Sequence, residues 1–553
     1  MALALSLLLR LGSAAFATPP NVIAVVEPIP GNIFTGHKDL EGLSIKVSHP
    51  ESVNPNPEFH PTAVASRIFP DNGLSDTPID GGYASRDRWS LWSYQIQSTT
   101  YFPKAVDEIG QGARIVNESA GYQSYTPSDT LRANLFDQMV YKHRTVFTQI
   151  AHNYGPGDAT LLDPAGAYNA IVIGATGRTE APPDSDPFRG LAQGAYIADY
   201  SSRGPTTDGR RKPDLVAPGT FVTLATYDPA NPTDTGATKR TAGTSFSGPY
   251  TAGVAARLIE QADDRGWNSD PLTLKAVLLN SAQQVSQQYS LADGVYSPEV
   301  WDGWSPTNTD KPLDLDQGAG EISLPRAEWQ YFTNPEQTPG GVARVGWDFE
   351  PALASGTTQW YFFDKPVHAG ATLTATLDWF REFDAAGNGL GLDDLNLELW
   401  KTDGVTPLSL VTQSNSQIDN VEHIHRFDVP DTSFYALAVN FKVDHSQGGA
   451  DAFGLAWTLP DSPFLPGDGN LDGRVDLTDF GLLKAHFGAG TLLSEGDFDL
   501  DRDVDLSDFG LLKANFGKTG GAGAVAVPEP PAGVLGLLAL VGLSLRRRMK
   551  RAA

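Results

Sequence analysis

The stretch GTSFSGP, residues 243–249, runs directly into the small-residue segment YTAGVAARLIEQ, residues 250–261. The small side chains predict a helix from Pro249 to Gln261, with the proline near its first turn, where a missing N–H costs little. A serine at the start of a helix lies beside free backbone N–H groups and the positive end of the helix dipole. Ser245 is therefore a candidate nucleophile, and a serine that only caps the helix is the alternative.

Apolar runs elsewhere in the first 325 residues have the pattern of buried strands. The runs VIAVV, residues 22–26, and NAIVIGA, residues 169–175, are continuous rather than alternating. Such runs are typical of strands that are covered on both faces in a parallel sheet. Because they alternate with helical patterns, the sequence predicts an α/β domain with a mostly parallel sheet over residues 20–325.

Three segments that precede Ser245 support a nucleophile over a simple helix cap. They are YSSRGP (200–205), KPDLVAPG (212–219) and IAHNYG (150–155). Together, and in this order, they resemble the subtilisin-like serine proteases, the subtilases, in which the serine after Gly-Thr is the nucleophile. The resemblance covers residues 22–325 and implies a subtilisin-like catalytic domain that hydrolyses peptide bonds in protein or peptide substrates.

His60 is the candidate general base, because an imidazole accepts and returns a proton near neutral pH. Its segment, FHPTAVAS (59–66), is similar to the subtilase helix start His-Gly-Thr-His-Val-Ala-Gly, with substitutions at the second and fourth positions. His37 and His49 are rivals, but neither leads into a small-residue helix. An ordinary surface histidine is the alternative for His60.

Glu27 ends the strand of residues 22–26, where subtilases have the aspartate that orients the histidine. It precedes His60 by 33 residues, which is close to the spacing in the family. A carboxylate holds the imidazole in the correct tautomer and stabilises the imidazolium, and a glutamate does this if the backbone recedes by about one methylene. The alternatives are a charged residue at a strand end and a degenerate, inactive site.

Asn153 and its neighbours are the candidate oxyanion and substrate residues. The resemblance implies that the Asn153 amide donates to the tetrahedral intermediate, alongside the backbone N–H of Ser245. The preceding residue, His152, departs from the small residue usual in the family, and we expect it to narrow or polarise the specificity pocket. Residues 115–121 resemble the strand that pairs with the substrate backbone. The residues that line the substrate there are Ser119, Ala120 and Gly121.

The region from residue 329 to 460 has a different pattern. Short aromatic or alternating runs are separated by Gly, Asp, Pro and Ser, and nothing has a helical period. This pattern predicts a β-sandwich, and it resembles the β-rich modules that follow the catalytic domain in secreted bacterial proteases. The region contains no recognisable catalytic constellation.

Residues 464–518 contain an internal duplication with a 29-residue offset, and each copy carries a dense set of acidic side chains. Oxygen ligands at loop positions one, three, five, nine and twelve form a calcium cage, so the spacing favours Ca²⁺ binding over a solvated acidic face. The candidate ligands are Asp468, Asn470, Asp472, Asp476 and Asp479 in the first copy, and Asp497, Asp499, Asp501, Asp505 and Asp508 in the second.

Each copy pairs its loop with one helix, and the pair resembles type I dockerins, which are small α-helical calcium-binding domains. The resemblance implies docking to a cohesin-like partner, and a self-contained calcium-stapled spacer is the alternative. The second copy departs from the pattern at Arg502, which replaces the glycine of the sharp turn. Residues 519–526 are rich in Gly and Ala and are expected to form a linker.

Both ends of the chain have the composition of targeting segments. Residues 1–18 have the features of a signal peptide, although Arg10 interrupts the apolar run. Residues 527–553 combine a Val-Pro-Glu-Pro segment, an apolar stretch and a terminal basic cluster. They resemble the PEP-CTERM sorting signal, which an exosortase cleaves during export, and a plain C-terminal membrane anchor is the alternative. Either interpretation puts the body of the protein outside the cell.

Composition limits the remaining possibilities. The chain has 553 residues and no cysteine, which excludes disulfides, thiolate catalysis and Cys-ligated zinc. Its formal net charge of -26 makes nucleic acid an unfavourable partner. The sequence predicts an exported or cell-surface bacterial serine endopeptidase. The alternatives are a catalytically impaired subtilase-like scaffold that binds peptides, and an assembly protein that acts through its calcium modules.

Overall fold

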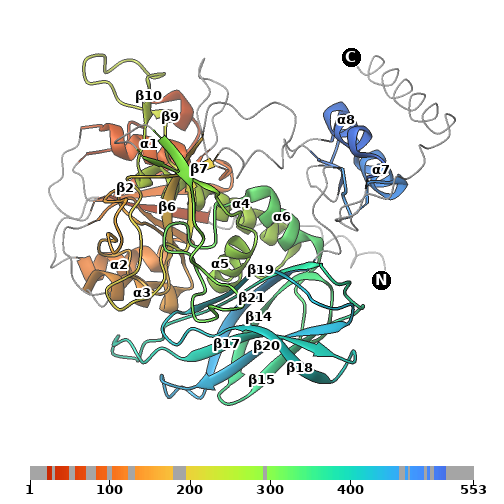
Figure 1. The fold of residues 1–553 in the computed structure, drawn as a ribbon. Coiled ribbons are helices and arrows are strands. Elements are labelled where there is room, and N and C mark those ends of the chain that lie inside the picture. The colour runs from red at the N-terminus through yellow and green to blue at the C-terminus, as the bar shows by residue number, and fades with distance from the viewer. Residues whose placement is uncertain are drawn as a thin grey trace, which may run out of the picture. The chain divides into compact units, whose positions relative to one another are not determined.

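The structure, a computed structural model, is described here over twelve segments of the chain (Figure 1). The segments are residues 21–27, 31–48, 56–69, 83–95, 102–121, 131–178, 195–290, 295–459, 467–470, 474–490, 495–498 and 504–518. They fall into two units, one up to residue 459 and the other from residue 460 onward, with residues 370–372 counted in the second. The predicted leader (1–18), linker (519–526) and C-terminal signal (527–553) lie outside them. Within these segments, no helix has the length and apolar character needed to cross a membrane.

The first unit is built on a ten-stranded sheet. Its strands are β1 (Asn21–Glu27), β2 (Ser44–Ser48), β3 (Trp89–Gln95), β4 (Ile115–Glu118), β5 (Val146–Ile150), β6 (Ile171–Arg178), β7 (Ala195–Ala198), β8 (Leu215–Pro218), β11 (Gln287–Ser290) and β12 (Val295–Pro298). Their order is β12-β11-β7-β6-β5-β4-β1-β3-β2, and β8 pairs with β6. Only the pairs β6–β7 and β11–β12 are antiparallel among the pairs described. The predicted α/β fold with a mostly parallel sheet is confirmed.

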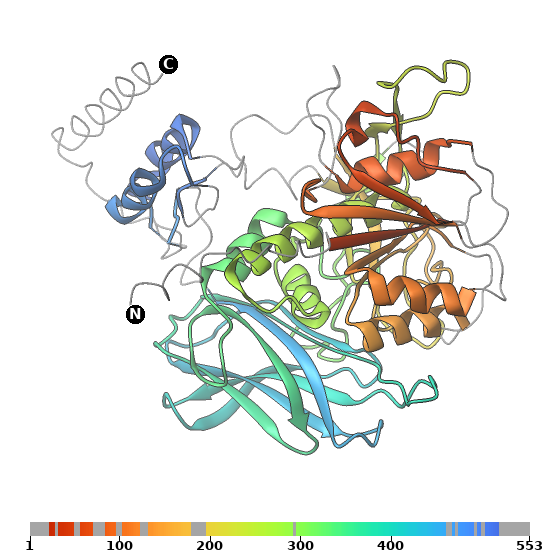
Figure 2. The same ribbon diagram turned by 180° about the vertical axis from the view of Figure 1, so that it is seen from behind.

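Helices cover both faces of this sheet (Figure 2). They are α1 (Phe59–Ile68), α2 (Phe102–Gly112), α3 (Leu131–His143), α4 (Thr244–Arg265), α5 (Pro271–Asn280), α6 (Leu324–Thr333) and the short 3-10 helix η1 (Lys38–Leu40). On β1, Ile23 and Val25 pack into the core shared with α1, α4 and α5, whereas Ala24 and Val26 pack against α2 and α3. The continuous apolar run of β1 is therefore buried on both faces, as expected for a central strand.

Helix α4 starts earlier than the sequence predicts, at Thr244 rather than at Pro249. Pro249 therefore lies inside the helix, where it has no N–H to donate to the carbonyl of Ser245. The hydroxyl of Ser119 donates to that carbonyl instead, at 3.0 Å. This replacement hydrogen bond allows the helix to continue through the proline, and it ties the start of α4 to the chain that leaves β4.

Smaller sheets follow in the same unit. A two-stranded sheet contains β9 (Val222–Ala225) and β10 (Thr238–Thr241). A five-stranded sheet has the order β13 (Gly340–Val342), β15 (Thr358–Phe363), β20 (Phe434–Val443), β17 (Asp394–Thr402) and β18 (Pro407–Ser414). A four-stranded sheet has the order β14 (Val345–Ala354), β21 (Ala450–Thr458), β16 (Thr372–Trp379) and β19 (Val421–Asp428). The last two sheets touch where the hydroxyl of Tyr361 donates to Asp348 Oδ2 at 2.6 Å.

The four-stranded sheet packs directly on α5. A Cβ atom on Gly454 of β21 would lie 2.4 Å from the backbone of Leu272, so no side chain fits at this position. Lys275 of α5 forms a buried ion pair with Asp378 of β16 at 2.9 Å. The predicted boundary between residues 325 and 329 therefore falls inside one unit, and the region from residue 329 to 459 shares its core with the α/β part.

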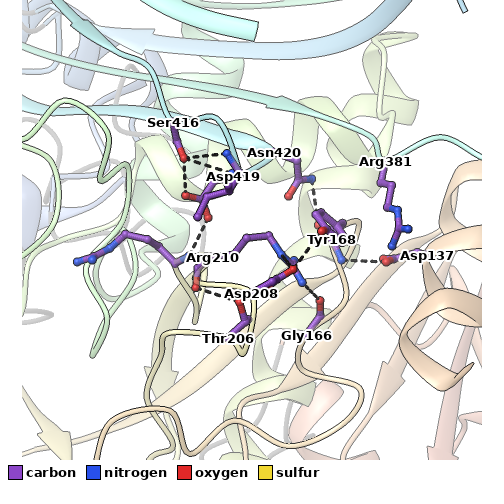
Figure 3. Close-up of polar contacts among 12 residues, drawn as sticks. Asp137, Gly166, Tyr168, Thr206, Asp208, Arg210, Arg381, Ser416, Asp419 and Asn420 are labelled. Atoms are coloured by element: carbon purple, nitrogen blue, oxygen red, sulfur yellow. Dashed lines mark hydrogen bonds and ion pairs between the residues drawn. The ribbon is translucent and has the colours of Figure 1, made fainter. Parts of the chain in front are cut away.

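A buried polar network also joins this sheet region to the chain segments that precede β6 and β8 (Figure 3). The Asn420 side-chain amide donates to the carbonyl of Tyr168 at 3.0 Å. Asp419 Oδ1 accepts the backbone N–H of Arg211 at 2.7 Å. The sheet region is thus bonded to the chain just before β6, at Tyr168, and to the chain just before β8, at Arg211.

The second unit contains the duplicated sequence. Its helices are α7 (Leu477–His486) and α8 (Leu506–Asn515). A Cβ atom on Gly467 would lie 2.9 Å from Leu512 Cα, and a Cβ atom on Gly496 would lie 2.4 Å from Leu483 Cα. Each repeat therefore begins with a glycine that touches the helix of the other repeat, and the two repeats pack as a reciprocal pair.

Candidate active site

Glu27 and His60 form an acid–base pair. Glu27 is the last residue of β1, and His60 is the second residue of α1. His60 Nδ1 lies 2.8 Å from Glu27 Oε2, and the glutamate side chain is fully buried. Burial alone lowers the pKa of His60, but the charge of Glu27 and the hydrogen bond to it raise that pKa above its usual value. With Nδ1 bonded to the carboxylate, Nε2 is the atom left to act as a base.

Ser245, the second residue of α4, lies near His60 because the starts of α1 and α4 pack together. The centroid of the Phe246 ring is 6.0 Å from that of His60 and 6.2 Å from that of Phe59. Ser245 is half-buried, and its Oγ donates to the carbonyl of Ser119 at 3.5 Å. Within the described residues, no hydrogen bond joins Ser245 Oγ to His60, a bond that in proteases often forms only in the substrate complex.

Arg67, in the last turn of α1, ties the end of this helix to the start of α4, and sequence reasoning misses it. Its side chain is buried in α1, where Nε donates to the carbonyl of Phe246 at 3.2 Å and Nη2 donates to that of Pro218 at 2.7 Å. The guanidinium also lies 4.6 Å from the ring centroid of Tyr250. The sequence signal is an arginine inside a helix whose other residues are mainly small or apolar.

The Asn153 amide is oriented by the start of α4. Its Oδ1 accepts the backbone N–H of Thr244 at 2.9 Å and the Thr244 hydroxyl at 3.0 Å. The donor Nδ2 lies on the side of Gly243, where a Cβ atom would be 3.7 Å away from it. The Ser245 N–H is one of the first in the helix, so it has no acceptor within the helix. These two donors are suited to an oxyanion next to Ser245.

The predicted substrate residues follow β4 and lie beside Ser245. Ser119 contacts Ser245 twice, through its carbonyl and through its hydroxyl. The buried Gln149 amide donates to the carbonyls of Ala120 at 3.1 Å and Ile150 at 3.0 Å, so it ties the end of β4 to the end of β5. Sequence reasoning misses Gln149 as well, because an amide inside a strand gives no signal of its partners.

His152 lies between these two strand ends. A Cβ atom on Gly121 would lie 1.8 Å from His152 Cε1, so the imidazole is packed against the backbone of Gly121. The backbone of His152 has a φ of 85°, which residues with side chains rarely adopt. Burial lowers the pKa of His152 to about 3, and a hydrogen bond with the backbone of Leu162 offsets only part of this. The imidazole is therefore neutral across the physiological pH range.

Two other histidines, His37 and His49, are the alternatives to His60 that the sequence offers as the general base. His37 is buried, with Nε2 2.7 Å from the carbonyl of Ala237 and Nδ1 3.1 Å from Asp39 Oδ2. These contacts hold η1 and the loop before β10 rather than a nucleophile. His49 lies outside the described residues.

The predicted calcium ligands lie in the second unit. The described ones are Asp468, Asn470, Asp476, Asp479, Asp497, Asp505 and Asp508, whereas Asp472, Asp499 and Asp501 lie outside the described residues. The carboxylates at the twelfth loop position are buried and close the loops. Asp479 Oδ2 accepts the N–H of Asp476 at 2.8 Å, and Asp508 Oδ2 accepts that of Asp505 at 2.7 Å.

The chemical type of the ten candidate ligands suits a hard cation such as Ca²⁺, because all of them supply carboxylate or amide oxygens. Over the described residues alone, no three His, Asp or Glu side chains come close enough together to hold a metal ion. Asp476 and Asp505 also cap the starts of α7 and α8 through the N–H groups of Thr478 and Ser507. Part of the acidic pattern therefore has a helix-capping role that does not depend on a metal.

Comparison with known proteins gives a family for the central part of the chain. Residues 77–320 match the Subtilase family. Pyrolysin of Pyrococcus furiosus is 28% identical over 262 residues, which cover 44% of this chain and 16% of pyrolysin. Serine protease AprX of Bacillus subtilis is 31% identical over 122 residues, which cover 21% of this chain and 26% of AprX. The chain thus spans only a small part of the length of these relatives.

Among solved structures, fervidolysin from Fervidobacterium pennivorans, described as a keratinolytic enzyme related to subtilisin, is 18% identical with a TM-score of 0.40. That match covers 74% of this chain and 50% of fervidolysin. The family match and the serine protease relatives support a subtilase domain and the class of serine-type endopeptidases. The family match contains Ser245 and Asn153 but begins after His60, so the roles of Glu27 and His60 rest on their geometry.

Proposed function

We propose that the chain is a serine endopeptidase in which Ser245, His60 and Glu27 form the catalytic triad. The observation that carries the proposal is the 2.8 Å contact between His60 Nδ1 and the buried Glu27 carboxylate, at the point where the start of α1 packs against the start of α4. This arrangement orients Nε2 of the imidazole as a base and stabilises the imidazolium that forms during the reaction.

In the proposed reaction, Ser245 Oγ attacks the carbonyl carbon of a peptide bond while its proton passes to His60 Nε2. The carbonyl oxygen becomes an oxyanion that the Asn153 amide and the Ser245 N–H bind. His60 then gives the proton to the leaving amine, and the C–N bond breaks to leave an acyl-enzyme. A water molecule repeats the sequence on the ester, which releases the acid product and restores Ser245.

A serine-reactive fluorophosphonate tests this proposal on the purified protein. The expected result is one adduct on Ser245, mapped by peptide mass spectrometry, that is absent in Ser245→Ala and strongly reduced in His60→Ala. His143→Ala is the matched control, because His143 also pairs with a carboxylate, that of Asp107, but lies on α3 away from Ser245. A folded protein that gives no adduct, or an adduct on another serine, would overturn the assignment.

One observation favours a second candidate, a catalytically impaired subtilase-like scaffold that binds peptides. Ser245 Oγ is hydrogen-bonded to the Ser119 carbonyl and not to His60. If this arrangement persisted with substrate, peptides would pair with Ser119 to Gly121 without being cleaved. Peptide binding at equilibrium, with no adduct and no hydrolysis, would distinguish the scaffold from the enzyme.

The regions outside the α/β part extend the proposal. We infer that the two larger antiparallel-rich sheets form a β-sandwich and that the duplicated unit is a dockerin-like domain that binds Ca²⁺. Its partner would be a cohesin-like domain, or the unit is a spacer. Adding a calcium chelator to the full chain is expected to lower the thermal midpoint of the second unit, and an unchanged midpoint would contradict calcium binding.

We further propose that the protein is exported and reaches the cell surface. The sequence supports this through the leader-like residues 1–18 and the PEP-CTERM-like residues 527–553. An exosortase-type machinery would process the C-terminal segment, which would contact the membrane before cleavage. Fractionation of cells, with detection of the intact and the processed C-terminus, tests this route.

A further inference from the structure

His152 occupies the space where the substrate residue before the scissile bond would lie. The carbonyl of that residue must sit between Ser245 and Asn153, because these residues supply the nucleophile and the oxyanion donors. Because the proposed function has the substrate backbone pair with Ser119–Gly121, its side chain would project between this segment and the neighbouring segment Ala151–Asn153. The imidazole of His152 lies in that gap, in contact with the backbone of Gly121.

The two walls of this gap are fixed by hydrogen bonds. On one side, the buried Gln149 amide holds the carbonyls of Ala120 and Ile150 together. On the other side, the Ser202 N–H donates to the carbonyl of His152 at 2.9 Å. The whole residue His152 is only 4% exposed, so its imidazole is enclosed between these two walls. A large substrate side chain could not enter without displacing a ring that is held in place.

Two unfavourable features coincide at His152, and they point to a function rather than to stability. Its φ of 85° is a strained conformation for a residue with a Cβ atom. Its Nε2 is buried and has no hydrogen-bond partner among the described residues, which costs free energy in the folded state. A glycine would remove both costs, so a histidine at this position needs a reason other than folding.

We propose that the His152 imidazole fills the specificity pocket and restricts cleavage to peptide bonds preceded by a small residue: glycine, alanine or serine. The inference rests on the proposed function and names its substrate class. Because burial keeps the imidazole neutral, the restriction comes from its volume and not from its charge.

The test uses two peptides that differ only in the residue before the scissile bond, alanine or phenylalanine. We expect the wild-type protein to have a kcat/KM about 10- to 100-fold higher for the alanine peptide. His152→Gly should raise kcat/KM for the phenylalanine peptide and so remove most of this ratio. Gln447→Gly is the matched control, because it also replaces a positive-φ residue by glycine, on an exposed loop of the sheet region, and should leave the ratio unchanged.

Fluorophosphonate labelling of Ser245 tests the protease assignment separately from the role of His152. The reagent carries no residue before a scissile bond, so the specificity pocket does not affect it. Labelling of wild type together with equal cleavage of both peptides would overturn the role of His152 and leave the protease assignment intact. A ratio that persists in His152→Gly would also overturn it. Absence of labelling and of cleavage would overturn the protease assignment, and the substrate class with it.

Discussion

Glu27→Gln removes the charge of the acid–base pair while keeping its shape. The 2.8 Å contact between His60 Nδ1 and Glu27 Oε2 lies at a fully buried carboxylate, so water cannot replace the lost interaction. An amide at this position also favours the wrong tautomer of the imidazole. We expect kcat/KM near pH 8 to fall by about 10⁴-fold, the loss seen when a triad acid becomes an amide.

The pH profile of the same variant gives a second and independent readout. The proposed reaction requires neutral His60, so the acid limb of kcat/KM should follow the His60 pKa, which the Glu27 charge and hydrogen bond raise against the effect of burial. In Glu27→Gln only burial remains as a large effect, and burial lowers the pKa. The acid limb should therefore move to lower pH although the maximum rate falls.

The contribution of the pair to the free energy of unfolding should fall as pH rises, whereas the activity should rise. Because the folded state raises the His60 pKa, the pair stabilises the fold fully below the unfolded pKa of about 6.5, and this contribution is lost as pH rises through the folded value. Urea unfolding at several pH values, with the exposed Glu41→Gln as control, measures it. An unmoved acid limb, or activity within tenfold of wild type, would refute the role of Glu27.

Three further predictions concern other contacts in the first unit. Arg67→Met should lower the free energy of unfolding by about 1–3 kcal/mol, because the carbonyls of Phe246 and Pro218 each lose a hydrogen bond, and an unchanged urea midpoint would contradict this. Gly121→Ala should reduce kcat/KM at least about tenfold, because its Cβ would meet the imidazole, and the additional His152→Gly change should restore it. Failure of that rescue would argue against the contact. Asp419→Ala should lower the free energy of unfolding by about 1–3 kcal/mol, because the Arg211 N–H is left buried without its acceptor, whereas the exposed Asp431→Ala should not.

The sequence predicts those parts of the site that depend on local pattern. The apolar run of β1 predicts a buried strand, and Glu27 follows as its last residue. The small-residue segments after His60 and Ser245 predict helices, and both side chains lie at helix starts. Burial on two faces and helix formation need only short-range information, which is why these elements are recognisable in one sequence.

The start of α4 could not be predicted from the local sequence. A proline at position 249 predicts a helix that begins beside it, but the helix begins at Thr244 because Ser119 supplies the hydrogen bond that the proline lacks. Ser119 is 126 residues away from Ser245 in sequence. Arg67 bonds to the carbonyl of Phe246 across 179 residues. Partners at such separations follow from the topology of the sheet, which a local pattern does not contain.

The contacts of the sheet region also join parts of the chain that are far apart in sequence. They reach residues 153–170, the segment that carries Asn153 and precedes β6. At its front end this segment is held by α4, through the bonds from Thr244 to Asn153. At its far end, the Asn169 amide exchanges two hydrogen bonds with the backbone of Arg381, at 2.9 Å and 3.0 Å. Buried amides and carboxylates at this contact would lose their partners if the sheets were absent, at a cost that a detachable module would avoid. The segment that carries Asn153 is therefore anchored at one end by α4 and at the other by the sheets, so the sheet region belongs to the framework of the proposed active site.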